Sequence, residues 1–296
     1  MGYLYMTIVL ACWTVIAFVY RLADRKHAHR LLMTTGIGLS ALLLNAIFSL
    51  ASGTDPFSAH YSQFIIGGIM GLTGIAGIMS FMAAVARGPI SITWTVLSLS
   101  FASASALSLI FPGERPSMRG VLGLVLAAVA VTLLGLDMRE RRRGNGPGSP
   151  KKGWGLYMVI AFLTNSVGLY CFTLANHFAP DASAAHKFGY LLAMYGTLGI
   201  GSLALALLFR KGGKIVVSVG IGAVAGMLLF GGGFFALAAL KNAGVPAYVF
   251  YPATSGGSTI LVVAVSVLIL GEYPTRLGWT GLASGLIALI LLSAAA

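Results

Sequence analysis

The sequence predicts an all-α integral membrane protein, on the evidence of its composition, the positions of its charges and the number of its apolar runs. Of the 296 residues, 58% are hydrophobic and only 9% are charged, and the mean hydropathy is +0.92. A soluble domain carries about a quarter charged residues, so this chain has too few to cover a water-facing surface. Its seven acidic residues all lie between apolar runs or at their ends, as a bilayer demands of charged groups.

Ten segments have the length and apolar character that an α-helix needs to cross a bilayer, which is about 20 residues. The expected spans are residues 2–22, 31–52, 62–84, 89–111, 117–136, 154–176, 187–209, 215–240, 246–270 and 276–295. The first is expected to be retained as a helix, because no basic residue precedes Arg21. The connections are short, and several hold helix breakers such as Asp55-Pro56.

One connection differs from the others in composition. Residues 137–153 read DMRERRRGNGPGSPKKG, which is charged, rich in glycine and proline, and free of apolar periodicity. Such a composition predicts a flexible linker. The linker divides the chain into an N-terminal five-helix unit, residues 1–136, and a C-terminal five-helix unit, residues 154–296.

The basic residues indicate an orientation in the membrane. Most of the 19 lysines and arginines lie in the loops that follow odd-numbered spans, and only Arg115, Arg119, Lys187 and Lys241 lie on the other side. Because cytoplasmic loops carry the excess of basic residues, the linker is expected in the cytoplasm and both termini outside. The net charge of +12 therefore indicates membrane flanks, in a cell (inner or cytoplasmic) membrane, and not a nucleic-acid partner.

A motif occurs once in each half of the chain. Residues 113–123 and 271–281 both read G-E-x-P-[ST]-x-x-G-x-x-G, and each copy follows a segment rich in small residues that opens at Pro89 or Pro246. Proline and serine or threonine suit the first turn of a helix, and the glycines allow close helix packing. We interpret Glu114 and Glu272 as residues that fix this turn and not as substrate ligands.

The repeated motif gives the sequence a family resemblance. It resembles the drug/metabolite transporter superfamily, in particular its ten-helix members with two EamA-type repeats. The first and sixth spans also align at a constant offset, which pairs Tyr5, Trp13 and Thr14 with Tyr157, Asn165 and Ser166. Five helices per repeat imply two inverted repeats with a site between them. Ten-helix relatives are commonly described with both termini in the cytoplasm, whereas the charges here predict external termini. Many relatives carry a Trp-Gly pair in the first helix, where this sequence has Cys12-Trp13-Thr14.

Polar side chains at mid-membrane depth are the first candidates for a binding site. Asn45 and Asn165 are the clearest, because an amide that faced lipid would lack hydrogen-bond partners. The repeat pairs Asn165 and Ser166 with Trp13 and Thr14, so these residues are expected to face one central cavity. The alternative for either asparagine is a hydrogen bond between helices.

The ninth span adds a second kind of candidate. Pro252 cannot donate to the carbonyl of Tyr248, so we expect a kink or a break there whose free carbonyls and neighbouring Ser255 suit a polar ligand. A kink used only for packing is the alternative. The fourth span, its counterpart, contributes Trp94 and Ser98, and most serines of that span are expected to be packing contacts.

Aromatic residues add a third kind. Several aromatic faces around one cavity attract a cationic ligand without a buried acid. The candidates are Trp13, Trp94, Tyr170, Tyr190, Tyr195, Tyr248 and Tyr251.

These residues and the resemblance together predict a secondary transporter for a small polar or amphipathic metabolite, such as an amino acid or an amine. The resemblance implies alternating access, with spans three, four, eight and nine as the gate. A flippase for a lipid-linked sugar is the alternative within transport. A membrane transferase is the remote alternative, because it needs clustered acids whereas the acids here are scattered. No cofactor, metal or enzyme activity is expected. The expected partners are the bilayer and a small molecule, and a monomer is favoured over a dimer.

Overall fold

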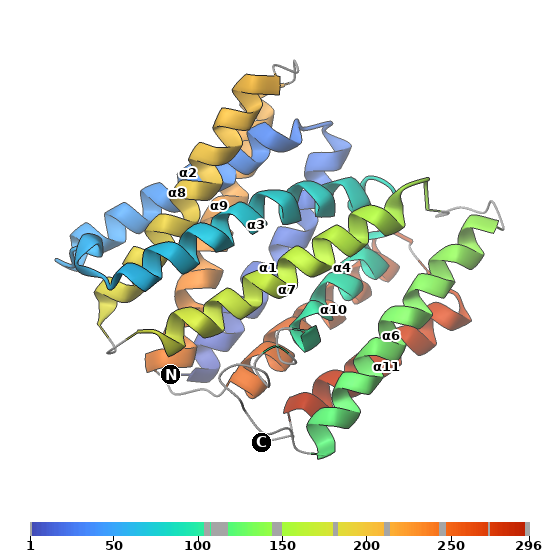
Figure 1. The fold of residues 1–296 in the computed structure, drawn as a ribbon. Helices are drawn as coiled ribbons and strands as arrows, with labels where there is room; N and C mark the ends of the chain where they lie inside the picture. Colours follow the sequence, from blue (N-terminus) through green and yellow to red (C-terminus); the bar gives the residue numbers. More distant parts are fainter. Residues whose placement is uncertain are drawn as a thin grey trace.

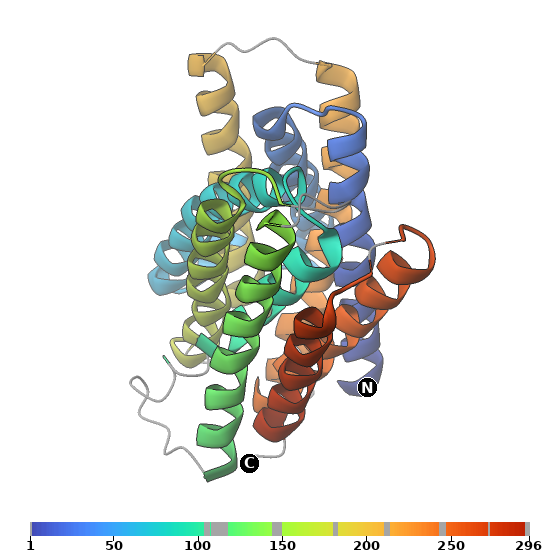
Figure 2. The same cartoon turned by 90° about the vertical axis from the view of Figure 1, so that its right-hand side faces the viewer.

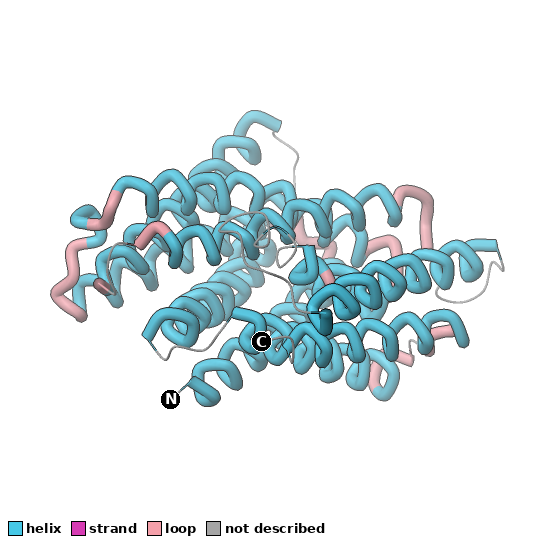
Figure 3. Tube along the Cα trace, turned by 60° about the horizontal axis from the view of Figure 1, so that its bottom comes forward, coloured by secondary structure: helices cyan, strands magenta, loops and turns pink. Residues whose placement is uncertain are grey.

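Apolar segments bounded by charged or helix-breaking residues form the helices of the structure, a computed structural model. It describes residues 2–103, 107, 118–143, 150–179, 183–209, 214–242, 247–271 and 273–293. Within these ranges all regular secondary structure is helical, as Figure 3 shows. The all-α class predicted from the sequence is therefore confirmed.

The described part of the N-terminal half contains five α-helices and one short 3₁₀ turn. They are α1 (Gly2–Arg25), α2 (Arg30–Ala51), η1 (Pro56–Ser58), α3 (Tyr61–Val85), α4 (Ile90–Ser98) and α6 (Met118–Arg143). The helix starts follow local chemistry, because His29 and Asp55 accept hydrogen bonds from backbone N–H groups at the starts of α2 and η1. Pro89 precedes the first residue of α4.

The described part of the C-terminal half contains five α-helices and one π-helical segment. They are α7 (Trp154–His177), α8 (Ala184–Phe209), α9 (Ile215–Leu237), the π-helical segment η2 (Ala238–Asn242), α10 (Ala247–Leu268) and α11 (Arg276–Ser293). Two connections use a left-handed backbone that favours glycine: Gly153 (φ +90°) before α7 and Gly271 (φ +66°) after α10. Gly271 is the first residue of the repeated motif, so its φ explains why the motif begins with glycine.

Seven helices in the described residues are long and apolar enough to cross a membrane. They are α1, α2, α3, α6, α7, α8 and α9. The chain is therefore a multi-pass membrane protein. Ten spans were expected, and the described parts of α4, α10 and α11 do not meet the same test of length and hydropathy.

Two sequence predictions need correction. The linker is shorter than predicted, because α6 continues to Arg143; arginine, glutamate and methionine are good helix formers, and the helix can extend beyond the apolar run. The break expected at Pro252 is absent, since α10 is one helix from Ala247 to Leu268. Glu114, Pro246 and Glu272 lie outside the described residues.

The helices pack in a pattern that links the two halves of the chain (Figure 1). Helix α2 packs against α8 and α9, and α3 packs against α7 and α8. Helix α1 packs against α9 and α10, α4 against α10, and α6 against α11. The start of α1 and the end of α11 lie on one side of the molecule, and the end of α6 and the start of α7 lie on the opposite side (Figures 1 and 2).

Glycines make two of these helix contacts very close. Two glycines four residues apart on α3 face backbone carbonyls of α8, and two on α9 face backbone carbonyls of α2. The pairs are Gly67 with Tyr190, Gly71 with Met194, Gly222 with Met33, and Gly226 with Ile37. A Cβ atom at any of the four would overlap the facing carbonyl oxygen, so these seams require glycine for the observed approach.

Candidate functional site

A central cavity of about 180 Å³ lies between the two halves of the chain. Helices α1, α3 and α4 line it from the first half, and α7, α8, α9 and α10 from the second. Most of its wall is aliphatic or glycine, and none of its lining residues carries a formal charge. The polar and aromatic lining residues are Trp13, Tyr20, Thr73, Phe81, Trp94, Ser98, Thr164, Asn165, Ser255 and Ser258.

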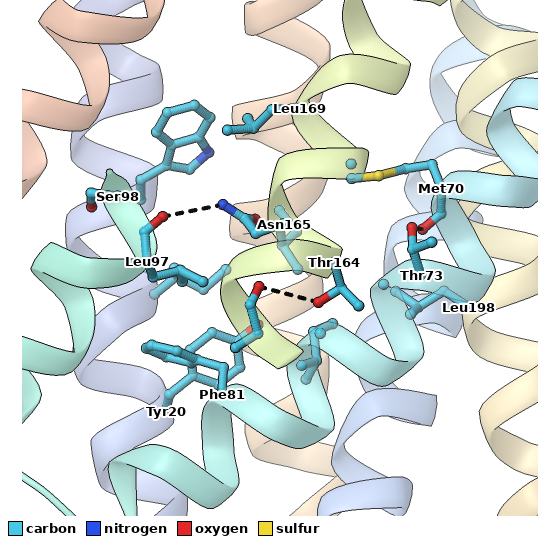
Figure 4. Close-up of a pocket in the computed structure, with 18 of the residues that line it drawn as sticks. Tyr20, Met70, Thr73, Phe81, Leu97, Ser98, Thr164, Asn165, Leu169 and Leu198 are labelled. Atoms are coloured by element: carbon cyan, nitrogen blue, oxygen red, sulfur yellow. Dashed lines mark hydrogen bonds between the residues drawn. The ribbon is translucent and has the colours of Figure 1, made fainter. Parts of the chain in front are cut away.

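Asn165 combines an interhelical contact with a free acceptor. Its Nδ2 donates to Ser100 Oγ at 2.6 Å and, at 3.5 Å, to the carbonyl of Leu97 in α4, a bond that Figure 4 shows. These two bonds fix the orientation of the amide. The described residues provide no hydrogen-bond partner for Oδ1, which is therefore available to a ligand with an N–H or O–H donor.

Trp13 reaches the same cavity from α1. It is half-buried, and its indole meets Phe250 edge-on with ring centroids 6.4 Å apart. The indole also passes close to Gly232 of α9, where an added Cβ would stand 3.0 Å from Nε1. In the described part of the chain no acceptor is bonded to Nε1. Trp13 therefore offers an apolar face and one N–H donor.

Serines of α4 and α10 occupy equivalent places in the two halves. Ser98 and Ser255 each follow the opening proline of their segment by nine residues, and both line the cavity. Neither hydroxyl group is hydrogen-bonded to another described residue. The cavity therefore has two such hydroxyls, one from each half.

Three aromatic side chains, Tyr20, Phe81 and Trp94, line the cavity near the ends of α1 and α3. Phe81 lies edge-on to Tyr20 at 5.5 Å and to Trp94 at 5.7 Å between ring centroids, and Figure 4 shows Tyr20 beside Phe81. Trp94 Nε1 donates to Ser258 Oγ at 3.4 Å. Tyr20 and Phe81 were not predicted as site residues. The sequence does indicate Tyr20, because Trp13, Ile16 and Tyr20 are spaced by three and seven residues and therefore share one face of a helix.

Other predicted site residues lie behind the cavity wall. Tyr195 donates to the carbonyl of Leu229 at 2.9 Å, and Tyr251 donates to the carbonyl of Leu169 at 3.4 Å. Both carbonyls belong to cavity-lining residues, whereas the two buried tyrosines do not themselves line it. Tyr190 is fully buried, and its hydroxyl has no partner among the described residues.

Three further predicted residues, Asn45, Thr14 and Tyr170, are also outside the cavity. Asn45 is fully buried, and its Nδ2 donates to the carbonyl of Phe188 at 3.1 Å. This is the hydrogen bond between helices that was the alternative to a role in the binding site. Thr14 bonds to the carbonyl of Leu10 in its own helix, and Tyr170 is not among the lining residues. The side chain of Tyr248 is outside the described part. The structure thus brings Trp13, Trp94, Ser98, Asn165 and Ser255 together.

The described residues that line the cavity include no charged side chain and no cluster of acids. In the described residues no three His, Cys, Asp or Glu side chains gather where they could hold a metal ion. What the arrangement offers is a small apolar space with single polar groups, which suits reversible binding.

Residues 1–136 match the EamA-like transporter family. This half of the chain is an EamA domain of the drug/metabolite transporter superfamily. Members of the EamA family are transporters, so the resemblance found in the sequence is confirmed over this range.

The fold of this chain is also found among solved structures. Among them 27 chains match, and one of these is 16% identical over 99% of this chain and 95% of the other, with a TM-score of 0.62. At that identity the likeness shows the fold alone. A comparison with curated protein sequences finds no match.

Proposed function

We propose that this protein is a secondary transporter that moves a small amphipathic metabolite, such as an amino acid or an amine, by alternating access to the central cavity. The observation that carries the proposal is that repeat-related residues of both halves line one cavity: Trp13 with Asn165, and Ser98 with Ser255. A site formed between two halves opens to one side or the other when the halves rock against each other.

Ten membrane spans in two inverted five-helix repeats, residues 1–136 and 154–296, provide the architecture for this mechanism. The packing supports it. If α1, α2, α3, α4 and α6 are exchanged with α7, α8, α9, α10 and α11 in that order, several helix contacts become other contacts that are also observed. The contact α2–α9 becomes α8–α3, α1–α9 becomes α7–α3, and α1–α10 becomes α7–α4. The pairs α2–α8, α4–α10 and α6–α11 are unchanged by the exchange. The two glycine seams also correspond, with α3 on α8 in one and α9 on α2 in the other.

The chemistry of the cavity supports a small, mainly apolar substrate with a polar end. An apolar cavity of about 150 Å³ accepts benzene, so about 180 Å³ suits a ligand of similar size and disfavours a lipid-linked sugar. The ring faces of Trp13, Trp94 and Phe81 would contact the apolar part. Asn165 Oδ1 and the free serine hydroxyls would take the N–H or O–H groups, and an ammonium would also be attracted by the aromatic faces.

We further propose that α3, α4, α9 and α10 move as the gate, and that Glu114 and Glu272 hold the turn before the last helix of each repeat. The glycine seams support this assignment, since small residues allow backbones to slide at short distance. A monomer suffices for this mechanism, because both halves are in one chain.

For the membrane and the orientation, we propose the cytoplasmic membrane with the linker inside and both termini outside, on the Lys/Arg distribution. A C-terminal fusion to a reporter that is active only in the cytoplasm tests the orientation. Low activity is expected, and strong activity would reverse the assignment.

The transport site is tested by ligand binding. Purified protein is screened by thermal unfolding against amino acids, amines, nucleosides and sugars, and the best ligand is then titrated against Trp13→Ala and Asn165→Ala. Both variants are expected to weaken binding about tenfold or more, because each loses a contact group of the cavity. Trp279→Ala, an exposed tryptophan of α11, is the matched control and should bind as the unaltered protein does. Unchanged affinity in both cavity variants would overturn the site.

A further inference from the structure

A second hollow lies away from the central cavity, between α4, α6 and α7. Its volume is about 390 Å³. The walls are apolar and are formed by Val96, Val131, Met158, Val159, Phe162 and Leu163. Val159 and Leu163 are 56% and 57% exposed, so the groove opens on a surface that faces the hydrocarbon of the bilayer.

One end of this groove is basic. Lys151 lines it and Lys152 follows, both exposed. The backbone N–H of Lys151 donates to the carbonyl of Arg87 at 2.8 Å, which fixes the segment beside the end of α3. The guanidinium of Arg87 lies 4.6 Å from the centroid of the Tyr157 ring. None of the described residues that line the groove is acidic. Arg87 lies beside this end, because its Nε would stand 3.9 Å from a Cβ at Gly153, a lining residue. The end of the groove therefore has Lys151 in its lining, Lys152 next to it in the chain and Arg87 beside Gly153.

The apolar part has the length of an acyl chain segment. From Trp154 to Leu163 the wall follows ten residues of α7, whose first and last Cα atoms are separated by about 14 Å at the rise of an α-helix. Because the basic end coincides with the start of α7, it lies at the membrane boundary, where lipid headgroups are found. The groove therefore offers apolar walls to the hydrocarbon chain of a lipid and cations to its headgroup.

We propose that this groove binds one anionic phospholipid, with an acyl chain along α7 and its phosphate at Lys151, Lys152 and Arg87. Apolar burial holds the chain, and the lysines select a net negative headgroup over a zwitterionic one. The occupant is a lipid and not the central substrate, because the groove and the central cavity share no lining residue. This proposal does not depend on the transport proposal.

The charge selectivity is tested by native mass spectrometry of the full chain in detergent, titrated with phosphatidylglycerol or with phosphatidylcholine of the same acyl chains. One tightly retained phosphatidylglycerol per chain is expected, with phosphatidylcholine at least about tenfold weaker. Lys151→Gln with Lys152→Gln should reduce phosphatidylglycerol retention by about fivefold per lysine. Arg25→Gln with Lys26→Gln, which removes two charges from the α1–α2 connection on the same side, is the control and should leave it unchanged. Equal retention of the two lipids would overturn the proposal.

The chain-binding part is tested by filling the groove. Gly135 and Gly155 line it, and a Cβ at either position would meet no atom within 4 Å. Gly135→Leu and Gly155→Leu should therefore fold and should abolish the retained lipid, whereas Gly220→Leu, equally open on α9, should not. Retention unchanged in both filled variants would contradict the proposal. So would full competition by glycerol phosphate, which indicates an anion site without a chain, or a change of oligomeric state, which indicates a second copy in the groove.

Discussion

Trp13 of α1 and Asn165 of α7 lie 152 residues apart, at matching positions of the two halves, and their side chains line the same cavity. They are chemically different at matching positions, one with a donor and a large ring, the other with a free acceptor. These two residues therefore make the lining of the cavity asymmetric. A bound molecule that is apolar at one end and polar at the other would have a single preferred orientation.

The repeat-related serines provide a prediction that separates binding from stability. Ser98→Ala and Ser255→Ala remove hydroxyls without a described protein partner, so each should change the free energy of unfolding by less than about 0.5 kcal/mol. Loss of a hydrogen bond to a ligand should weaken binding by about 1 kcal/mol, or fivefold. Calorimetric titration together with thermal unfolding checks both. Lower stability with unchanged affinity would assign the serines to packing.

Asn165 is predicted to contribute both to the stability of the protein and to ligand binding. Asn165→Leu removes the bonds to Ser100 and to the Leu97 carbonyl, so the protein should lose about 1 kcal/mol of stability, in the range measured for hydrogen bonds between membrane helices. It should also lose the acceptor Oδ1 and bind the ligand at least about tenfold more weakly. Asn45→Leu is the comparison, because its amide bonds to Phe188 outside the cavity. That variant should lose stability and keep its affinity.

The glycine seams make a prediction about packing. Gly222→Ala places a methyl group against the Met33 carbonyl, and the required separation of α9 from α2 should cost about 1–3 kcal/mol. Gly220→Ala is the control two residues away, with open space around it, and should stabilise the helix by about 0.5–1 kcal/mol. Thermal unfolding in one detergent compares them. Equal effects in the two variants would show that the seam does not depend on close approach.

A buried carboxylate connects the last helices of the two halves. Asp137 of α6 is fully buried and accepts a hydrogen bond from Thr275, the threonine of the second repeated motif. Thr275→Val should therefore cost about 1–3 kcal/mol, because a buried acceptor loses a donor. Thr280→Val removes an exposed hydroxyl that bonds only within α11 and should cost less than about 0.5 kcal/mol. A cost in the same range for both variants would mean that the Asp137 contact does not hold the two helices together.

The sequence predicted helix ends well where a charge or a breaker stops an apolar run, as at Arg30 and His177. It failed where composition and helix propensity disagree, because residues 137–143 are polar and still continue α6. Pro252 lies in the second turn of α10, where a missing N–H does not end the helix.

The repeat in the sequence pairs Trp13 with Asn165, and both residues line the same cavity. The sequence could not tell which buried polar groups find a protein partner. The Asn45 amide meets the Phe188 carbonyl, whereas Asn165 keeps one atom free, and that difference depends on the neighbouring helix. Tyr20 and Phe81 were missed because each reaches the cavity from the end of a long helix, where an aromatic side chain more often anchors at the interface.

Protection of single cysteines tests the central claim most directly. Cys12 and Cys171 are first replaced by serine, and Trp13→Cys or Asn165→Cys is introduced singly, with Thr132→Cys on the exposed face of α6 as control. The rate of labelling by a small thiol reagent is then measured with and without the best ligand of the binding screen. We predict that the ligand slows labelling at both cavity positions and not at position 132. Binding of the ligand without protection at either cavity position would contradict the account.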